Sequence, residues 1–418
     1  MLTSKRTARA ISRPEFIGLI AAMMALNSLA IDVMLPALPN IGEALGVASE
    51  NERQLVIAAY MIAFGAAQLF FGPLSDRFGR RGPVLVGIAI YIVAAFLAPL
   101  TPNFYMLLAL RAIQGIGAAA TRVVAISVVR DRFAGRDMAQ VMSLAFMVFM
   151  ALPIVAPGIG QLFLLVGSWH YIFLFMAGLA AVIGGWAYFR MPETLAPEHR
   201  RALSLSAITD GFRIVVSNRV AFLYGICGAL LFGGMFGYIS SSEQIFVGIY
   251  GLGPLFPVAF AIMAALMMGS NFLNARIVQR FGMRRISHTA VLLIIGFATI
   301  LVIWSHIAPP SLPVFFILAT AILFLYGLAP NNINSLSMEP LGEVAGTASS
   351  VFGFLQTVGG ALIGSYTGQH FDGTVAPVAT GFLTIGLVTL ACILLAEKGR
   401  LFGVGEQYKD RAAPMFAE

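Results

Sequence analysis

Long apolar runs recur along the whole sequence, separated by short polar stretches. Twelve of these runs are long enough to cross about 30 Å of hydrocarbon as helices. None shows the alternation of apolar and polar residues that a lipid-facing strand needs, so we predict transmembrane helices. The predicted spans are 16–38, 53–72, 82–100, 104–127, 138–166, 169–190, 219–246, 254–275, 286–308, 312–335, 346–368 and 376–396.

A polar stretch at 191–218, with two prolines and several charges, separates the first six spans from the last six. We interpret it as a cytoplasmic linker that contains a short amphipathic helix around 204–216. The predicted organisation is a cytoplasmic N-terminus (1–15), an N-terminal six-helix bundle (16–190), the linker (191–218), a C-terminal six-helix bundle (219–396) and a cytoplasmic tail (397–418).

Composition supports a membrane protein, because 59% of the 418 residues are hydrophobic and 11% are charged. A soluble chain of this length could not bury so much apolar surface. The 26 basic residues lie on the predicted cytoplasmic side, apart from Arg53, Arg111 and Arg122. This bias predicts that both termini are cytoplasmic. It also accounts for the net charge of +7 by topology and anionic lipid, so no nucleic-acid partner is expected.

A short polar hairpin, Gly72-Pro-Leu-Ser-Asp-Arg-Phe-Gly-Arg-Arg81, lies between the second and third spans. Its end, Arg77-Phe-Gly-Arg-Arg81, returns half a chain later as Arg280-Phe-Gly-Met-Arg284. The repeat predicts two membrane-embedded halves of like design, which is the architecture of a secondary transporter.

Several motifs in register resemble one family. The 72–81 hairpin resembles the loop between the second and third helices of the major facilitator superfamily. The fourth and fifth spans resemble the motifs of its proton-coupled drug exporters at Arg111-Ala-Ile-Gln-Gly-Ile-Gly117 and Pro153-Ile-Val-Ala-Pro-Gly-Ile-Gly160. Three further stretches resemble the Bcr/CflA drug-resistance branch: Ile31-Asp-Val-Met-Leu-Pro-Ala-Leu-Pro39, Val129-Arg-Asp131 and Ser168-Trp-His-Tyr-Ile-Phe173.

The resemblance implies an all-α protein of twelve transmembrane helices in two six-helix bundles, placed in a bacterial inner membrane. It also implies a monomer that exchanges protons for small drug-like molecules, without cofactor or metal. Two positions depart from the family pattern. His170 replaces an arginine, and Ser241-Ser-Glu-Gln244 replaces an apolar stretch in the seventh span, which leaves the substrate open.

Asp32 and Arg111 are charged residues inside predicted spans, where a charge is costly and needs a reason. Counted at 1.5 Å per residue, both lie about 9–10 Å below the outer surface. Equal depth on the first and fourth helices makes them candidate partners. In the functional interpretation Asp32 carries the proton and Arg111 adjusts its affinity; in the alternative they form a static ion pair.

Further residues are expected near the substrate. Gln114 lies one turn below Arg111 and would face the same cavity. Arg122 lies lower, where snorkelling or bracing of a gate is as reasonable as chemistry. Low-specificity candidates for lining the cavity are Asn27, Met34, Met235, Tyr238 and Tyr326, any of which can instead be ordinary packing residues.

The 72–81 hairpin is interpreted as an inner gate. Gly72 and Gly79 allow tight turns, and Asp76 can cap a helix or pair with an arginine. Arg77, Arg80 and Arg81 are expected to bind inner-loop carboxylates or helix C-termini when the inner side closes, with Asp131 and Glu343 as candidate partners, unless their role is topology alone. The second copy carries Gln279 where the first has Asp76, so its contacts are expected to be weaker.

The fifth-helix motif contributes four residues, Pro153, Pro157, Gly158 and Gly160. The resemblance implies that their kinked, small-residue face seals the contact between the two halves; the alternative is chance proline and glycine in a membrane helix.

The leading functional hypothesis is a proton-driven exporter of small lipophilic or cationic drugs. The same fold allows a facilitator that exports one metabolite, such as a sugar or an amino-acid derivative. An enzyme is disfavoured because the five histidines are scattered and no phosphate-binding glycine loop appears. A channel is disfavoured by the two-half repeat.

Overall fold

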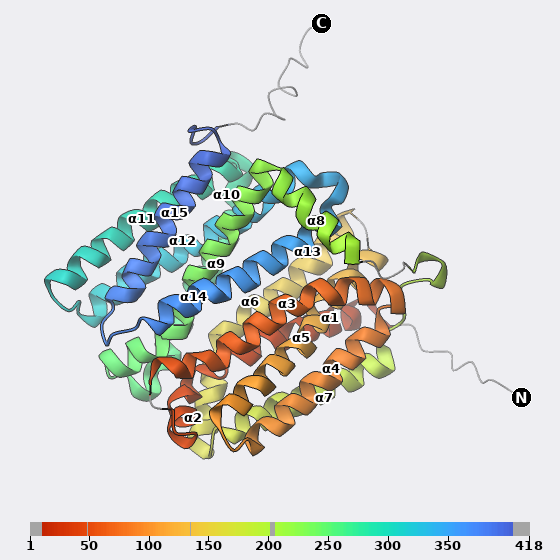
Figure 1. Cartoon of the computed structure of the whole chain (residues 1–418), viewed down its shortest axis with the longest axis horizontal. Helices are drawn as coiled ribbons and strands as arrows, with labels where there is room; N and C mark the ends of the chain where they lie inside the picture. The colour runs from red at the N-terminus through yellow and green to blue at the C-terminus, as the bar shows by residue number, and fades with distance from the viewer. Residues whose placement is uncertain (1–10, 48, 134, 201–204, 404–418) are drawn as a thin grey trace, which may run out of the picture. The chain divides into compact units, whose positions relative to one another are not determined.

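The computed structural model describes residues 11–47, 49–133, 135–200 and 205–403 (Figure 1). Within these residues all regular elements are helices. The chain divides into two compact units: the N unit, Met1–Ser206 with Leu252–Ile262, and the C unit, Ala207–Gly251 with Met263–Glu418. Residues 1–10 of the predicted N-terminus and 404–418 of the predicted tail lie outside the described part.

The N unit is built from seven helices in the described chain, joined by the first part of α10 (Phe256–Phe281). The bounds are α1 (Arg13–Asp32), α2 (Leu38–Ala44), α3 (Leu55–Phe78), α4 (Arg81–Leu97), α5 (Phe104–Arg132), α6 (Gly135–Val166) and α7 (His170–Arg190). Helix α5 packs along both α3 and α4, and α6 packs along α1. A short 3₁₀ turn, η1 (Leu35–Ala37), joins α1 to α2.

In the C unit, α9 is the central helix and contacts α12, α14 and α15. The bounds are α9 (Arg219–Glu243), α10 (Phe256–Phe281), α11 (Met283–Ile307), α12 (Leu312–Met338), α13 (Ala345–Phe354), α14 (Gly360–Gln369) and α15 (Ala376–Ala396). Helix α10 begins in the segment that belongs to the N unit. Two π-helical stretches occur in the described part of this unit: η5 (Gln244–Ile249) follows α9, and η8 (Leu355–Gly359) lies between α13 and α14.

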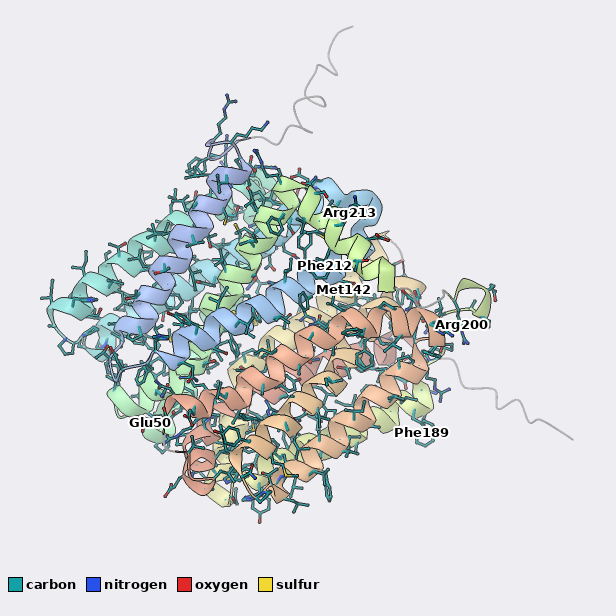
Figure 2. The ribbon with its side chains drawn as sticks, viewed as in Figure 1. Glu50, Met142, Phe189, Arg200, Phe212 and Arg213 are labelled. Atoms are coloured by element: carbon teal, nitrogen blue, oxygen red, sulfur yellow. The ribbon has the colours of Figure 1, made fainter. Side chains whose placement is uncertain are left out.

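The predicted spans correspond to helices. Ten helices in the described chain are long and apolar enough to cross a membrane. The other two predicted spans, 138–166 and 346–368, coincide with α6 and with the run α13–η8–α14. Large apolar side chains stay exposed along these helices, as Phe189 does at 72% (Figure 2). Such exposure suits contact with lipid, so the all-helical, multi-span fold is confirmed.

The short helix expected around 204–216 is also confirmed, as α8 (Leu205–Ser217). Its Phe212 packs against a buried cluster that includes Val215 and Leu341, whereas Arg213 is exposed (Figure 2). An apolar face against the C unit and a charged face away from it is the amphipathic pattern that the sequence predicted.

Helix ends follow local signals. Ser12 accepts the backbone N–H of Glu15 at the start of α1, and Asn103 accepts that of Met106 at the start of α5. These side chains satisfy N–H groups that have no partner inside their helix. At its other end α5 continues to Arg132, beyond the predicted residue 127, because helical hydrogen bonds do not stop where the apolar run stops.

Candidate functional site

The N unit holds Asp32 at a break in α1. Pro36 has no N–H to offer the carbonyl of Asp32, and the chain continues as a 3₁₀ turn with Met34 N bonded to Ile31 O. The Asp32 side chain is 4% exposed and accepts a hydrogen bond from Ser28 Oγ at 2.9 Å. The break therefore leaves a buried carboxyl group at the end of the helix.

Arg111 lies fully buried on α5 and binds neighbouring helices. Its guanidinium donates to Ala30 O at 2.8 Å, to Val56 O at 3.0 Å and to Gln114 Oε1 at 2.6 Å. Its Cζ also lies 4.6 Å from the ring centre of Tyr60. Arg111 thus joins α1, α3 and α5 through directional hydrogen bonds.

The expected ion pair between Asp32 and Arg111 is not found among the described residues. Arg111 uses backbone carbonyls instead, one of them at Ala30, two residues before Asp32. Arg111 lies at the level of Ala30 on α1, close in height to Asp32. Equal depth does not determine, however, in which direction each side chain points around its helix axis. The static ion-pair interpretation is therefore wrong for this conformation.

The other N-unit residues expected near substrate are buried and partnered. Asn27 accepts from Tyr60 Oη and donates to Thr121 Oγ1, both at 3.2 Å. Gln114 is held by Arg111, and Met34 is fully buried beside the break in α1. Asn27 and Gln114 thus belong to polar contacts between α1, α3 and α5.

In the C unit, Tyr238 and Tyr326 both pack against Phe382. Their ring centres lie 6.4 Å and 5.8 Å from that of Phe382. Tyr238 Oη contacts Met263 Sδ at 3.0 Å, whereas the buried Tyr326 hydroxyl finds no hydrogen-bond partner in the described chain. Met235 is half-buried on α9. An unsatisfied buried hydroxyl is able to bind a polar group of a ligand.

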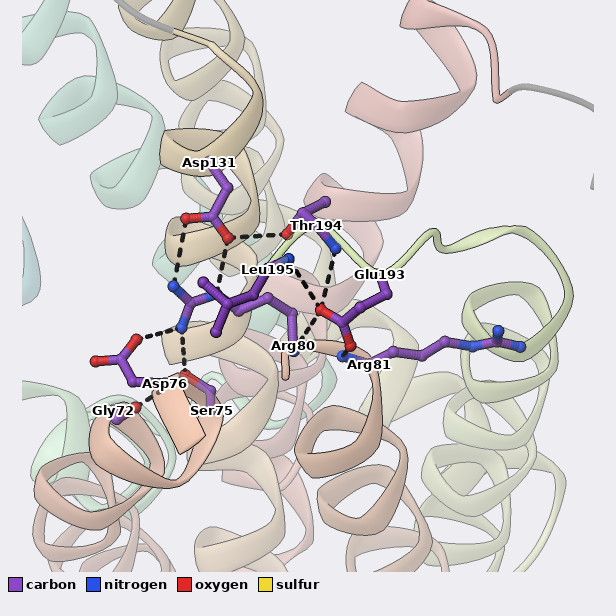
Figure 3. A network of polar contacts seen from close by, with 9 residues as sticks. All are labelled: Gly72, Ser75, Asp76, Arg80, Arg81, Asp131, Glu193, Thr194 and Leu195. Atoms are coloured by element: carbon purple, nitrogen blue, oxygen red, sulfur yellow. Dashed lines mark hydrogen bonds and ion pairs between the residues drawn. The ribbon is translucent and has the colours of Figure 1, made fainter. Parts of the chain in front are cut away.

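The 72–81 hairpin builds a polar network around Arg80 (Figure 3). Arg80 is 3% exposed and pairs with Asp76 at 2.5 Å and with Asp131 at 2.8 Å. Burial alone lowers the pKa of Arg80, but hydrogen bonds to Asp131 and Asp76 outweigh it and raise that pKa above its ordinary value. Gly72 contributes its carbonyl, which accepts from Ser75 Oγ at 2.9 Å. The predicted contact with Asp131 is confirmed.

Glu193, in the first turn of chain after α7, completes this network (Figure 3). Its carboxylate accepts the backbone N–H groups of Arg80 at 2.8 Å and of Arg81 at 3.2 Å. It therefore caps the start of α4 from a distant segment, a position where negative charge is favourable. Sequence reasoning missed Glu193, because nothing local links residue 193 to residue 80.

The three arginines of the hairpin differ in their contacts. Arg81 donates to the carbonyl of Tyr188 and lies over that ring at 5.4 Å. Arg77 lies over the ring of Phe78 at 5.5 Å and, within the described chain, forms no ion pair. The expectation of an inner carboxylate or a helix C-terminus is therefore confirmed for Arg80, through Asp131, and for Arg81, through the C-terminal end of α7. Within the described chain, neither kind of contact is found for Arg77. The Glu343 side chain lies outside the described residues.

The second copy of the hairpin also pairs an arginine with two carboxylates. Gly79 and Gly282 both have positive φ, +90° and +78°, so the turn itself is repeated. Arg284 pairs with Glu339 at 3.0 Å and with Glu397 at 2.8 Å. The second copy thus lacks an acid at Gln279 and finds its carboxylates in distant segments instead. The expectation that its contacts are weaker stays a prediction.

The fifth-helix motif lies on α6, with Pro153 half-buried and Pro157 buried. Gly160 packs on the break in α1, so closely that a Cβ there would meet the carbonyl of Val33 and, at 2.9 Å, the ring of Pro36. A Cβ at Gly158 would meet nothing within 4 Å. This contact lies within the N unit, and the seal between the halves stays a prediction.

These features define a multi-span membrane protein with buried polar groups inside its helical units. A family model described as Major Facilitator Superfamily matches residues 20–365, and the chain belongs to this superfamily of transporters. The solved structure of a D-xylose-proton symporter has a TM-score of 0.70 at 14% identity, covering 92% of this chain and 98% of the symporter. That likeness supports the fold alone.

Two relatives bear drug-resistance names. The bicyclomycin resistance protein homolog of Haemophilus influenzae is 29% identical over 405 residues, covering 95% of this chain and 98% of the relative. The chloramphenicol resistance protein of Pseudomonas aeruginosa is 30% identical over 420 residues, covering 97% and 96%. The drug-resistance branch indicated by the motifs is confirmed, and the chain is a transporter related to it rather than an enzyme.

Proposed function

We propose that this transporter exports small lipophilic or cationic drugs in exchange for protons, with Asp32 as the group that carries the proton. The supporting observation is the place of Asp32, buried at the break in α1 with Ser28 as its hydrogen-bond donor. Among the described residues, Asp32 has no ion-pair partner. A carboxylate inside a membrane is costly unless it is paired, and such residues typically mark proton pathways.

The surroundings of Asp32 suit a group whose access to water changes during transport. The α1 break follows Asp32 directly, and its last turns are held by packing of Gly160 on Val33 and Pro36 rather than by continuous helical bonds. A helix end held in this way changes angle at low cost. We include in the proposal that alternating access exposes Asp32 to each side of the bacterial inner membrane in turn.

The test is drug-dependent proton flux in everted membrane vesicles with an acid interior. We expect chloramphenicol, or a lipophilic cation, to dissipate the pH gradient with the wild-type protein. Asp32→Asn is expected to abolish this effect, because the amide still accepts from Ser28 but cannot carry a proton. Asp137→Asn is the matched control, since Asp137 is an exposed carboxylate bound to Arg13 in the same unit.

Two results would overturn the proposal. Equal proton flux in wild type and Asp32→Asn would remove Asp32 as the proton carrier. Drug movement by wild type that is the same with and without the gradient would instead support a facilitator, the alternative on the same fold.

A further inference from the structure

Arg122 lies deep in α5, far from both ends of this long helix. It is ten residues before Arg132, which corresponds to about 15 Å along the helix. Snorkelling brings a charged head to the membrane surface only when the side chain can span the distance, and an arginine side chain is shorter than this. Arg122 therefore does not reach the level of Arg132, at the end of α5, by snorkelling.

Within the described chain, Arg122 is also without a polar partner. Three other N-unit arginines are satisfied: Arg111 by three acceptors, Arg80 by Asp76 and Asp131, and Arg190 by Glu15. Among the residues that the structure describes, Arg122 has no hydrogen bond and no ion pair. Arg122 is half-buried, and none of its nitrogens is among the fully buried side-chain atoms without a partner. Its five N–H donors are therefore available to an acceptor that the described residues do not supply.

What Arg122 does contact is an aromatic surface. Its Cζ lies 5.8 Å from the ring centre of Phe64, and Phe64 is stacked on Tyr60 at 6.0 Å with the rings 6° from parallel. Arg111 lies over the other end of this pair. The four side chains form a stack in the order Arg111, Tyr60, Phe64, Arg122. The ring of Phe64 orients the planar guanidinium of Arg122 without using the N–H groups of that guanidinium.

The polar side chains linked to the Tyr60 end of this stack are neutral. Thr121, the neighbour of Arg122 in sequence, is bonded to Asn27, which is bonded in turn to Tyr60. None of these carries a charge that could balance the guanidinium. This part of the N unit therefore has a positive potential, which attracts anions and repels cations.

We propose that Arg122 binds a planar, oxygen-bearing group of the transported molecule, such as a carboxylate, so that aromatic anions are preferred over cations of the same size. The guanidinium fork matches a carboxylate in shape and charge, and the Tyr60–Phe64 pair provides the adjoining apolar surface. The inference rests on the proposed export function, and it replaces the cationic part of the substrate class proposed there with aromatic anions.

The test uses three probes with one ring system: 2-naphthoate, its methyl ester, and the (2-naphthylmethyl)trimethylammonium cation. Binding is measured by calorimetry on the full chain in lipid nanodiscs, without a pH gradient. We expect wild type to bind naphthoate more tightly than the other two. Arg122→Gln should weaken naphthoate binding by about 10- to 100-fold, the range for a hydrogen bond to a charged group.

Controls separate recognition from folding. Arg122→Gln should bind the methyl ester as wild type does, and Arg122→Lys should retain part of the preference for the anion. Arg132→Gln removes an exposed arginine of the same helix and should change nothing. The inference is overturned if wild type fails to bind naphthoate, or prefers the ester or the cation, or if Arg122→Gln binds naphthoate as Arg132→Gln does.

Different experimental results would contradict the inference and the proposed function. If Arg122-dependent naphthoate binding is found but no probe or drug dissipates the pH gradient, proton exchange is wrong and the binding site stands. If the ester or the cation drives proton flux that depends on Asp32 and not on Arg122, the export function stands and the preference for anions is wrong.

Discussion

Gly79 shows how a single residue connects two distant parts of the N unit. Its φ of +90° with ψ of +170° belongs to a region that is open to glycine and strained for other residues. The space where a Cβ would stand is occupied by the carboxylate of Glu193. That carboxylate also caps α4. Both the turn at residue 79 and the cap of α4 therefore require a residue without a Cβ at this position.

We expect Gly79→Ala to destabilise the protein by about 1–3 kcal/mol, the usual cost of such a backbone conformation. Displacement of Glu193 should add to the loss, because the N–H groups of Arg80 and Arg81 would lose their acceptor. A lower melting temperature in detergent would show this. Gly82→Ala, at an exposed helical position where a Cβ meets nothing within 4 Å, should leave the melting temperature unchanged or raise it. Equal melting temperatures for the two variants would contradict the argument.

Residue types in the sequence predicted some of these contacts and could not predict others. The pairing of Arg80 with Asp131 was foreseeable because both lie at predicted inner helix ends. The acceptors of Arg111 are mainly backbone carbonyls, which every residue has, so no sequence pattern marks them. Glu193, Glu339 and Glu397 act across the fold, and their partners depend on tertiary packing that a single sequence does not display.

At the scale of elements, every span predicted from a hydrophobic run coincides with a helix or a run of helices. The runs are informative because lipid requires a continuous apolar helix surface. What the runs do not reveal is where helices change type. The break after Asp32 has a visible cause in Pro36, but the π-helical stretch at Leu355–Gly359 has no proline and was not foreseen. Such changes depend on packing against neighbouring helices.

The contact of α6 with the break in α1 gives a prediction at this scale. Gly160→Ala should push α6 away from Val33 and Pro36, since the new Cβ has no room against the Val33 carbonyl. We expect a loss of about 1–3 kcal/mol from overpacking, together with reduced drug-dependent proton flux. Gly158→Ala, on the same helix with open space around it, should behave as wild type in thermal unfolding and in vesicles. If Gly160→Ala transports normally, the α1–α6 contact has no part in transport.

At the scale of the whole chain, the two halves repeat a design with different residues. Each hairpin turns at a glycine of positive φ and places one arginine between two carboxylates, Arg80 in the N unit and Arg284 in the C unit. The two arginines occupy different positions of the repeated motif, since Arg284 corresponds to Arg81. The turn and the pairing are thus kept, while the residue that makes the pairing has changed.

The basic residues of both hairpins also set the orientation that the chain should have in the membrane. Because Lys and Arg are retained on the cytoplasmic side, we expect the linker to face the cytoplasm and the loop between α11 and α12 to face outward. Glu198 and Ser311 are exposed positions in these two segments. After Cys227 and Cys392 are replaced by serine, Glu198→Cys and Ser311→Cys provide one reporter on each side. A membrane-impermeant maleimide added to intact spheroplasts should label Ser311→Cys and not Glu198→Cys, and disrupting the membrane should make both reactive. The reverse labelling would show that the charge bias does not set the orientation, and would place the Arg80 and Arg284 clusters on the outer side.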